Sequence, residues 1–208
     1  MADSEGAVWS EIDKSRGELA DLLDSLKADE WDEFSLCTAW KVKDVAGHVT
    51  MDVRPRTVFP GIIKKGFRFN KFNEDTAREN GKKPPSQLVS ELRNLIGQRT
   101  RAPFTKTKDV LTDTLVHTQD IKRPLGRPNT FPAERWVIVA DFIKDHRFYK
   151  TAKKRAGLKL KATDVDWSVG EGELVEGPIE AIVMALMGRT DALDDLSGPG
   201  VETLRSRP

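Results

Sequence analysis

The 208-residue chain lacks several features that would fix its class at once. Its single cysteine, Cys37, excludes an internal disulfide framework and a multi-cysteine zinc knot, and suits a reducing compartment. No stretch approaches the roughly 18 consecutive apolar residues of a transmembrane helix. The first residues, MADSEGAVWSEIDKS, are acidic and lack the apolar run of a signal peptide. We therefore expect a cytoplasmic protein without a membrane partner.

The net charge is also small: the chain has 34 Lys and Arg residues and 33 Asp and Glu residues, which gives a formal net charge of +1. Such a balance provides no overall field that would attract nucleic acid, so we expect no nucleic-acid partner. The hydrophobic share of 38% is enough for a sizeable core, in one large domain or two small ones. The chain has no internal repeat, and we expect a folded monomer or homodimer.

Apolar residues at helical spacing predict a helical domain over residues 1–150. Residues 54–85 mix aromatic, basic and helix-breaking residues, and they predict a partly helical crossover between two of the helices. The predicted helices cover residues 4–27, a segment from Trp40 to about Pro55, a segment from Ser86 to about 100, residues 107–122, and a segment that begins after Pro132.

The periodicity changes in residues 151–208. Val165, Trp167 and Val169 alternate with polar residues, which is typical of a strand. The sequence GEG at 170–172 then predicts a hairpin with the following segment, ELVEG. Pro178 opens an amphipathic helix that Gly188 closes. This segment is therefore predicted to be a small α/β domain, and the whole chain belongs to the α+β class.

One segment of the predicted helix 107–122 carries several residues that can bind metal. Asp113, His117 and Asp120 fall within roughly 60 degrees of one another on one helix face, because each residue advances by about 100 degrees. His48 lies on another helix, in DVAGHV, where Gly47 permits close approach of a backbone or a ligand.

Two histidines and a carboxylate, with water in the remaining position, compose an open catalytic zinc site, and they also suit iron or nickel. The carboxylate of Asp120 is either a fourth ligand or a partner that orients His117 and thereby contributes to catalysis. The alternative is a hydrogen-bonded Asp113–His117 pair on a surface helix, with His48 as an ordinary core histidine.

Three segments together resemble the mycothiol-dependent maleylpyruvate isomerase family, part of the DinB-like superfamily of four-helix bundles: LCTAWKVKDVAGHV, DTLVHTQDIKRPLG and WSVGEGELVEGPIEAIVMALMGR. The resemblance implies a DinB-like bundle followed by a small α/β C-terminal domain. It implies His48, Asp113 and His117 as ligands of a divalent metal, usually zinc, and mycothiol, a thiol of actinobacteria, as cofactor. The isomerase that names the family has glutamate where this chain has Asp113.

This resemblance implies an isomerase or thiol transferase that acts on a small electrophile. The metal would hold the cofactor as a nucleophilic thiolate. Arg189 would pair with a carboxylate of substrate or thiol, and Arg54 and Arg56 are further candidates for binding the cofactor. A non-catalytic, metal-binding DinB-like stress-response protein is the alternative. In a third interpretation, the C-terminal part carries an apolar ligand.

Overall fold

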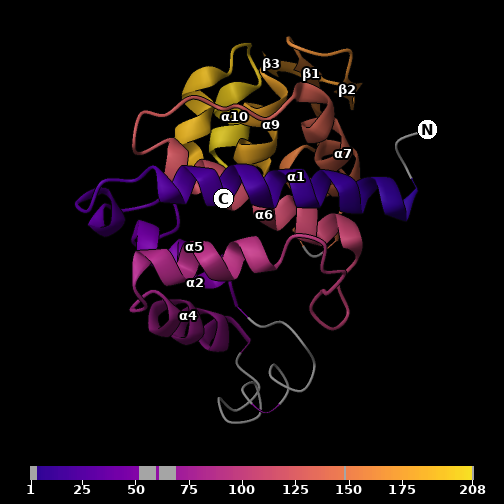
Figure 1. The fold of residues 1–208 in the computed structure, drawn as a ribbon. Coiled ribbons are helices and arrows are strands. Elements are labelled where there is room, and N and C mark those ends of the chain that lie inside the picture. Colours follow the sequence, from indigo (N-terminus) through magenta and orange to yellow (C-terminus); the bar gives the residue numbers. More distant parts are fainter. Residues whose placement is uncertain (1–3, 52–59, 61–68, 148, 208) are drawn as a thin grey trace. The chain divides into compact units, whose positions relative to one another are not determined.

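The computed structural model describes residues 4–51, 60, 69–147 and 149–207 (Figure 1). The elements lie in the following order: α1 (Glu5–Asp24), η1 (Glu30–Asp32), α2 (Val42–Val49), α4 (Phe69–Asn80), α5 (Pro85–Asn94), α6 (Thr107–Lys122), α7 (Ala133–Ile143), α8 (Thr151–Lys154), β1 (Leu158–Ala162), β2 (Ser168–Val169), β3 (Glu173–Gly177), α9 (Ile179–Leu186), η2 (Thr190–Asp195) and α10 (Val201–Arg205). The predicted α+β class is confirmed.

The chain divides into two compact units, Met1–Pro128 and Asn129–Pro208. The sequence placed the domain boundary at residue 150, which assigned the segment after Pro132 to the helical domain. That segment is α7, and it packs against α9 of the second unit.

Four helices of the first unit form a closed ring. Helix α1 packs against α5 and α6, and α2 packs against the same two helices from the other side. Helix α4 packs on α2 outside this ring. It lies in the segment that was predicted as a partly helical crossover. Helix α2 ends at Val49, earlier than the predicted end near Pro55. None of the helices in the described part of the chain is long and apolar enough to cross a membrane.

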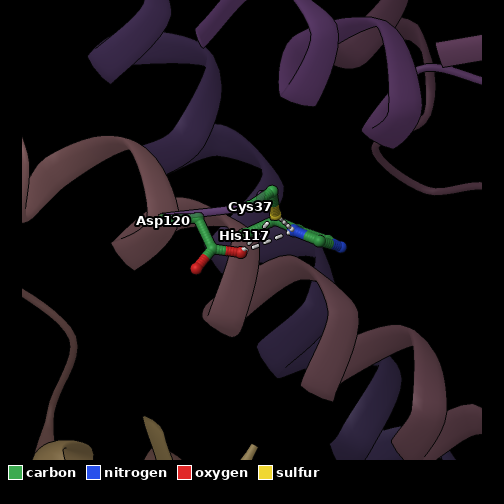
Figure 2. Close-up of side chains that lie close together, drawn as sticks. All are labelled: Cys37, His117 and Asp120. Carbon is green, nitrogen blue, oxygen red and sulfur yellow. Dashed lines mark hydrogen bonds and ion pairs between the residues drawn. The ribbon is translucent and has the colours of Figure 1, made fainter. Parts of the chain in front are cut away.

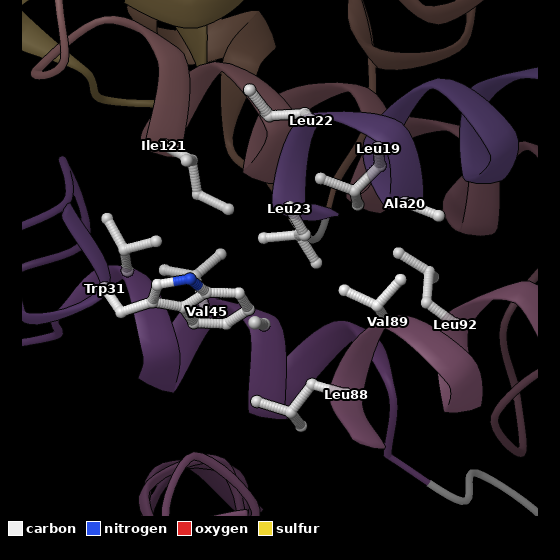
Figure 3. Packing of buried hydrophobic residues seen from close by; sticks show 12 residues of the cluster. Leu19, Ala20, Leu22, Leu23, Trp31, Val45, Leu88, Val89, Leu92 and Ile121 are labelled. Atoms are coloured by element: carbon white, nitrogen blue, oxygen red, sulfur yellow. The ribbon is translucent and has the colours of Figure 1, made fainter. Parts of the chain in front are cut away.

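The core of this ring is built from apolar side chains of all four helices (Figure 3). Leu19 and Leu23 of α1 recur at i and i+4, and therefore point from one face of that helix into the core. Leu88 and Leu92 of α5 repeat the same spacing. Burial of each such side chain contributes about 1.5–3 kcal/mol relative to exposure. The remaining buried members of the cluster are Ala20, Leu22, Trp31, Val42, Val45, Ala46, Val89 and Ile121.

The contact between α2 and α4 depends on a glycine. A Cβ atom at Gly47 would lie 2.5 Å from the amide nitrogen of Gly81, and closer still to the carbonyl oxygen of Ala77. The side-chain amide of Asn80 donates to the carbonyl oxygen of Gly47 over 3.1 Å. The close approach of another backbone that the sequence predicted at Gly47 is therefore confirmed, and it holds the residue before His48 in place.

The second unit contains a three-stranded sheet in the order β2-β1-β3. Strand β1 pairs antiparallel with β2, through Leu160 and Val169, and parallel with β3, through Leu160 and Val175. Helix α9 follows β3 and packs on β1, β3 and α7.

The predicted hairpin between residues 165–169 and 173–177 is wrong, because β1 lies between β2 and β3. Strand β1 was missed within a stretch rich in basic residues. Its alternation of buried Leu158, Leu160 and Ala162 with exposed Lys159 and Lys161 is nevertheless the pattern of a strand with one buried face.

Candidate metal centre

Two helices of the ring, α2 and α6, carry the candidate ligands, and both begin in the same way. A lysine precedes each helix, and the aspartate three residues later accepts a hydrogen bond from the backbone N–H of that lysine. The donor–acceptor distance is 2.9 Å between Lys41 and Asp44 and 2.8 Å between Lys106 and Asp109. The aspartate satisfies an otherwise unpaired donor and adds negative charge at the positive end of the helix. These contacts fix where each helix starts.

The structure brings His48 of α2 together with Asp113 and His117 of α6. The Oδ1 atom of Asp113 lies 3.4 Å from Nε2 of His48 and 3.4 Å from Nε2 of His117. The two imidazole rings meet edge to face, with centroids 4.8 Å apart. The side chains of both histidines are 13% exposed, whereas that of Asp113 is 48% exposed. Three potential metal ligands therefore converge where one of them is still accessible to solvent.

These distances fit a metal ion better than direct hydrogen bonds. A tetrahedral ion bound at about 2.0–2.1 Å separates its ligand atoms by about 3.3–3.4 Å. A good hydrogen bond between a ring nitrogen and a carboxylate oxygen is shorter, about 2.7–2.9 Å. The Nδ1 atom of His48 is buried and has no hydrogen-bond partner among the described residues, so this ring is held through its Nε2 side. The donor set fits a divalent metal with three protein ligands.

A second cluster lies on the other side of the His117 ring (Figure 2). It consists of Cys37, Asp120 and Nδ1 of His117. The Oδ2 atom of Asp120 is 2.9 Å from Nδ1 of His117 and 3.1 Å from Sγ of Cys37. A metal bound by sulfur at about 2.3 Å and by oxygen at about 2.0 Å would separate these two atoms by about 3.5 Å. The shorter distances indicate a hydrogen-bonded cluster rather than a second metal site.

The contact between Asp120 and His117 bears on the role of Asp120. A carboxylate that accepts the Nδ1–H of a histidine fixes the tautomer in which Nε2 keeps its lone pair. Nε2 is the atom that faces Asp113 and His48. The side chain of Asp120 has no exposed surface and approaches the ring from the opposite side. This geometry favours the orienting role over the alternative in which Asp120 is a fourth ligand.

The electrostatics of the site follow from the same contacts. Partial burial would raise the pKa of Asp113, but the imidazoles of His117 and His48 outweigh it and hold this pKa well below its usual range. Burial would lower the pKa of His117. The carboxylates of Asp113 and Asp120, with a smaller contribution from Cys37, raise that pKa well above its usual value. Without metal, the site therefore favours a doubly protonated, positively charged His117 beside an ionised Asp113.

Sequence analysis missed two residues of the site, Cys37 and Trp40. The indole of Trp40 lies against both rings, with centroids 5.4 Å from His48 and 6.5 Å from His117. Both missed residues lie in the loop before α2, about 80 positions from His117, and no short-range sequence signal links them to it. Sequence analysis used Cys37 only to exclude a disulfide framework and a multi-cysteine zinc knot and to indicate a reducing compartment, and it used Trp40 only as the start of a predicted helix.

The remaining predicted site residues lie outside the described part of the first unit. Arg54 and Arg56 lie outside the described residues. Arg189 belongs to the second unit, directly before η2, where its guanidinium donates to the carbonyl oxygen of Met187 over 2.8 Å. Its predicted contact with substrate or thiol stays a prediction. The third histidine, His146, was not predicted as a site residue; in the second unit its ring contacts the rings of Phe142 and Tyr149 in tilted geometry.

The fold and the site together define a class: a four-helix bundle with a cluster of candidate metal ligands on two of its helices, followed by a small α/β unit. Residues 12–109 match the sequence model of the mycothiol maleylpyruvate isomerase N-terminal domain. The matched segment contains His48 and ends before Asp113. The predicted resemblance to the mycothiol-dependent maleylpyruvate isomerase family is confirmed for these residues.

Solved structures agree with this assignment at the level of the fold. Two crystal structures, of the mycothiol-dependent maleylpyruvate isomerase and of a histidine-to-alanine mutant of it, each superpose with a TM-score of 0.65 at 12% sequence identity. The alignment covers 94% of this chain and 93% of the solved chain in both cases. No curated protein matches the chain significantly in sequence.

Proposed function

We propose that the protein is a metal-dependent enzyme that uses mycothiol to isomerise a small electrophilic substrate or to transfer the thiol to it. The observation that carries the proposal is the convergence of His48, Asp113 and His117 at metal-ligand separations. These residues lie in a chain whose first half matches the domain of a mycothiol-dependent isomerase family. Zinc is the first candidate for the metal, and nickel or iron are compatible with the same ligands.

Each ligand has a defined task in this proposal. His48 and His117 would offer Nε2 atoms, and Asp113 would offer a carboxylate oxygen and a negative charge that offsets part of the charge of a dication. A divalent ion at this position lowers the pKa of a bound thiol, so that the thiol reacts as thiolate at neutral pH. Three protein ligands leave a position for a small molecule, whereas structural zinc sites normally have four. This count favours catalysis over a purely structural metal.

Trp40 and the second unit supply the remaining parts of the proposal. The indole of Trp40 lies against both imidazoles and would shield them from water, which would strengthen their interaction with a cation. Arg189 would bind a carboxylate of the substrate or of the thiol.

The metal part of the proposal is tested by elemental analysis of the purified protein beside the variants His48→Ala, His117→Ala and His146→Ala. We expect about one equivalent of metal in the wild type and in His146→Ala, because the His146 ring contacts aromatic rings in the second unit. The His48→Ala and His117→Ala variants should lose the bound metal. Equal metal content in all four proteins would exclude this site.

The reaction is tested with mycothiol and maleylpyruvate, and then with other activated alkenes and electrophiles. Isomerisation returns the thiol unchanged at each turnover, whereas transfer consumes one thiol per product, so assays of free thiol and of substrate absorbance separate the two. Loss of turnover in Arg189→Ala with unchanged metal content would support its assignment to substrate or thiol. Metal binding without turnover on any of these compounds would favour the non-catalytic alternative.

A further inference from the structure

The loop before α2 is attached to the end of α6 at two points. The backbone N–H of Leu36 donates to the carbonyl oxygen of Asp120 over 3.0 Å. The thiol of Cys37 donates to Oδ2 of the same residue over 3.1 Å. Both the backbone and the side chain of Asp120 are therefore bound by consecutive residues of one loop.

The loop itself holds Cys37 in a defined position. The hydroxyl of Ser35 accepts from the backbone N–H of Cys37 over 3.1 Å and donates to the carbonyl oxygen of Trp40 over 2.9 Å. The backbone N–H of Trp40 donates to the carbonyl oxygen of Cys37 over 2.9 Å. These bonds close a tight turn that sets the direction of the Cys37 side chain, toward Asp120 and the His117 ring (Figure 2).

The Oδ2 atom of Asp120 accepts from two donors at once, the thiol of Cys37 and the Nδ1–H of His117. A carboxylate with no exposed surface depends on such donors, because burial without them is costly. The thiol also restricts rotation of the carboxylate, since it holds the same oxygen that the imidazole uses. Loss of the thiol would leave the carboxylate less well oriented toward Nδ1.

We propose that Cys37 is a positioning residue of the candidate metal centre: through Asp120, its thiol fixes the ring orientation and tautomer of His117. The inference rests on the proposed function for its purpose, because it concerns how a ligand of the proposed metal is presented. It assigns Cys37 no contact with metal or substrate.

The first test measures zinc affinity by competition with a chelating indicator in wild type, Cys37→Ala, Cys37→Ser, Asp120→Ala and the Cys37→Ala/Asp120→Ala double variant. We expect Asp120→Ala to weaken binding by about 10–100-fold, as is usual for a partner of a ligating histidine. Cys37→Ala should weaken binding by about fivefold, the effect of one net hydrogen bond. Cys37→Ser keeps a donor and should stay within about twofold of wild type.

The double variant separates positioning from packing. A thiol that acts through Asp120 has nothing to orient once that carboxylate is absent, so Cys37→Ala should cause no further loss in the Asp120→Ala background. Equal losses in both backgrounds would overturn the proposal, as would a Cys37→Ala variant that binds like wild type. Zinc stoichiometry that falls from two to one in Cys37→Ala would also overturn it, because Cys37 would then be a ligand.

The second test uses metal-free protein and does not depend on the proposed function. The ¹⁵N shifts of the His117 ring, recorded at a pH above its raised pKa, where the neutral ring carries a single proton, and assigned with His48→Ala and His146→Ala, report which nitrogen carries that proton. We expect Nδ1–H in wild type and Cys37→Ser, and a larger share of Nε2–H in Cys37→Ala and Asp120→Asn. Identical ring shifts in wild type and Cys37→Ala would refute the positioning role even if the wild type bound no zinc. Unfolding midpoints close to wild type show that each variant is folded.

Discussion

Replacement of Gly47 by alanine should destabilise the bundle, although alanine is the better helix former. Gly47 lies inside α2, so the intrinsic gain from the replacement is about 1 kcal/mol. The new Cβ atom would lie 2.5 Å from the nitrogen of Gly81 and 3.0 Å from the carbonyl carbon of Asn80. All of its nearest neighbours are backbone atoms, which cannot rotate away as a side chain can. Helix α4 would have to move away from α2.

The size of the effect follows from three contributions. Forced separation of well-packed elements costs about 1–3 kcal/mol. The hydrogen bond from the Asn80 side chain to the Gly47 carbonyl oxygen would be stretched, at a net cost of about 1 kcal/mol. Less the helix-propensity gain, the free energy of unfolding should fall by about 1–3 kcal/mol. Because His48 is the next residue, zinc affinity should fall as well.

Gly17 provides a matched control for this prediction. It lies in the middle of α1, and the nearest atom to an added Cβ there is Cδ1 of Ile96 at 4.0 Å, which is an ordinary contact. Gly17→Ala should therefore raise the free energy of unfolding by about 0.5–1 kcal/mol. Urea denaturation of the two variants and the wild type measures both changes. If Gly47→Ala were as stable as Gly17→Ala, the close packing of α4 on α2 would be refuted.

The other predictions concern the site and the sheet. Because the pKa of His117 is raised in the metal-free site, a proton must leave when metal binds, so zinc affinity should fall about tenfold per pH unit below that pKa. A zinc affinity that does not change between about pH 6 and pH 8 would contradict this competition. Asp113→Asn removes the main charge that raises the pKa of His117, and an NMR titration should show this pKa lower than in wild type; an unchanged titration would mean that the pair is not coupled. In the second unit, Leu160→Ala deletes a fully buried side chain and should cost about 2–5 kcal/mol of stability, whereas Lys159→Ala at the exposed neighbouring position should cost little; similar losses in both would argue against the observed register.

Several features of this protein could be read from the sequence because they depend on neighbours along the chain. Helical periodicity predicted residues 107–122 as a helix, and α6 has these bounds. The same periodicity placed Asp113, His117 and Asp120 on one face, since the angle between residues on a helix is fixed by its geometry. A glycine before His48 indicated a close backbone contact, which α4 makes.

Other features depend on contacts between distant segments, and only the tertiary structure decided them. The bundle packing that brings His48 to Asp113 and the approach of Cys37 and Trp40 to His117 join residues that are far apart in sequence. The insertion of β1 between β2 and β3 depends on which strands pair, which the alternation along each strand does not show. Periodicity shows which face of an element is buried, but not which element covers it. That choice comes from how all buried faces fit together, as the α2–α4 contact at Gly47 illustrates.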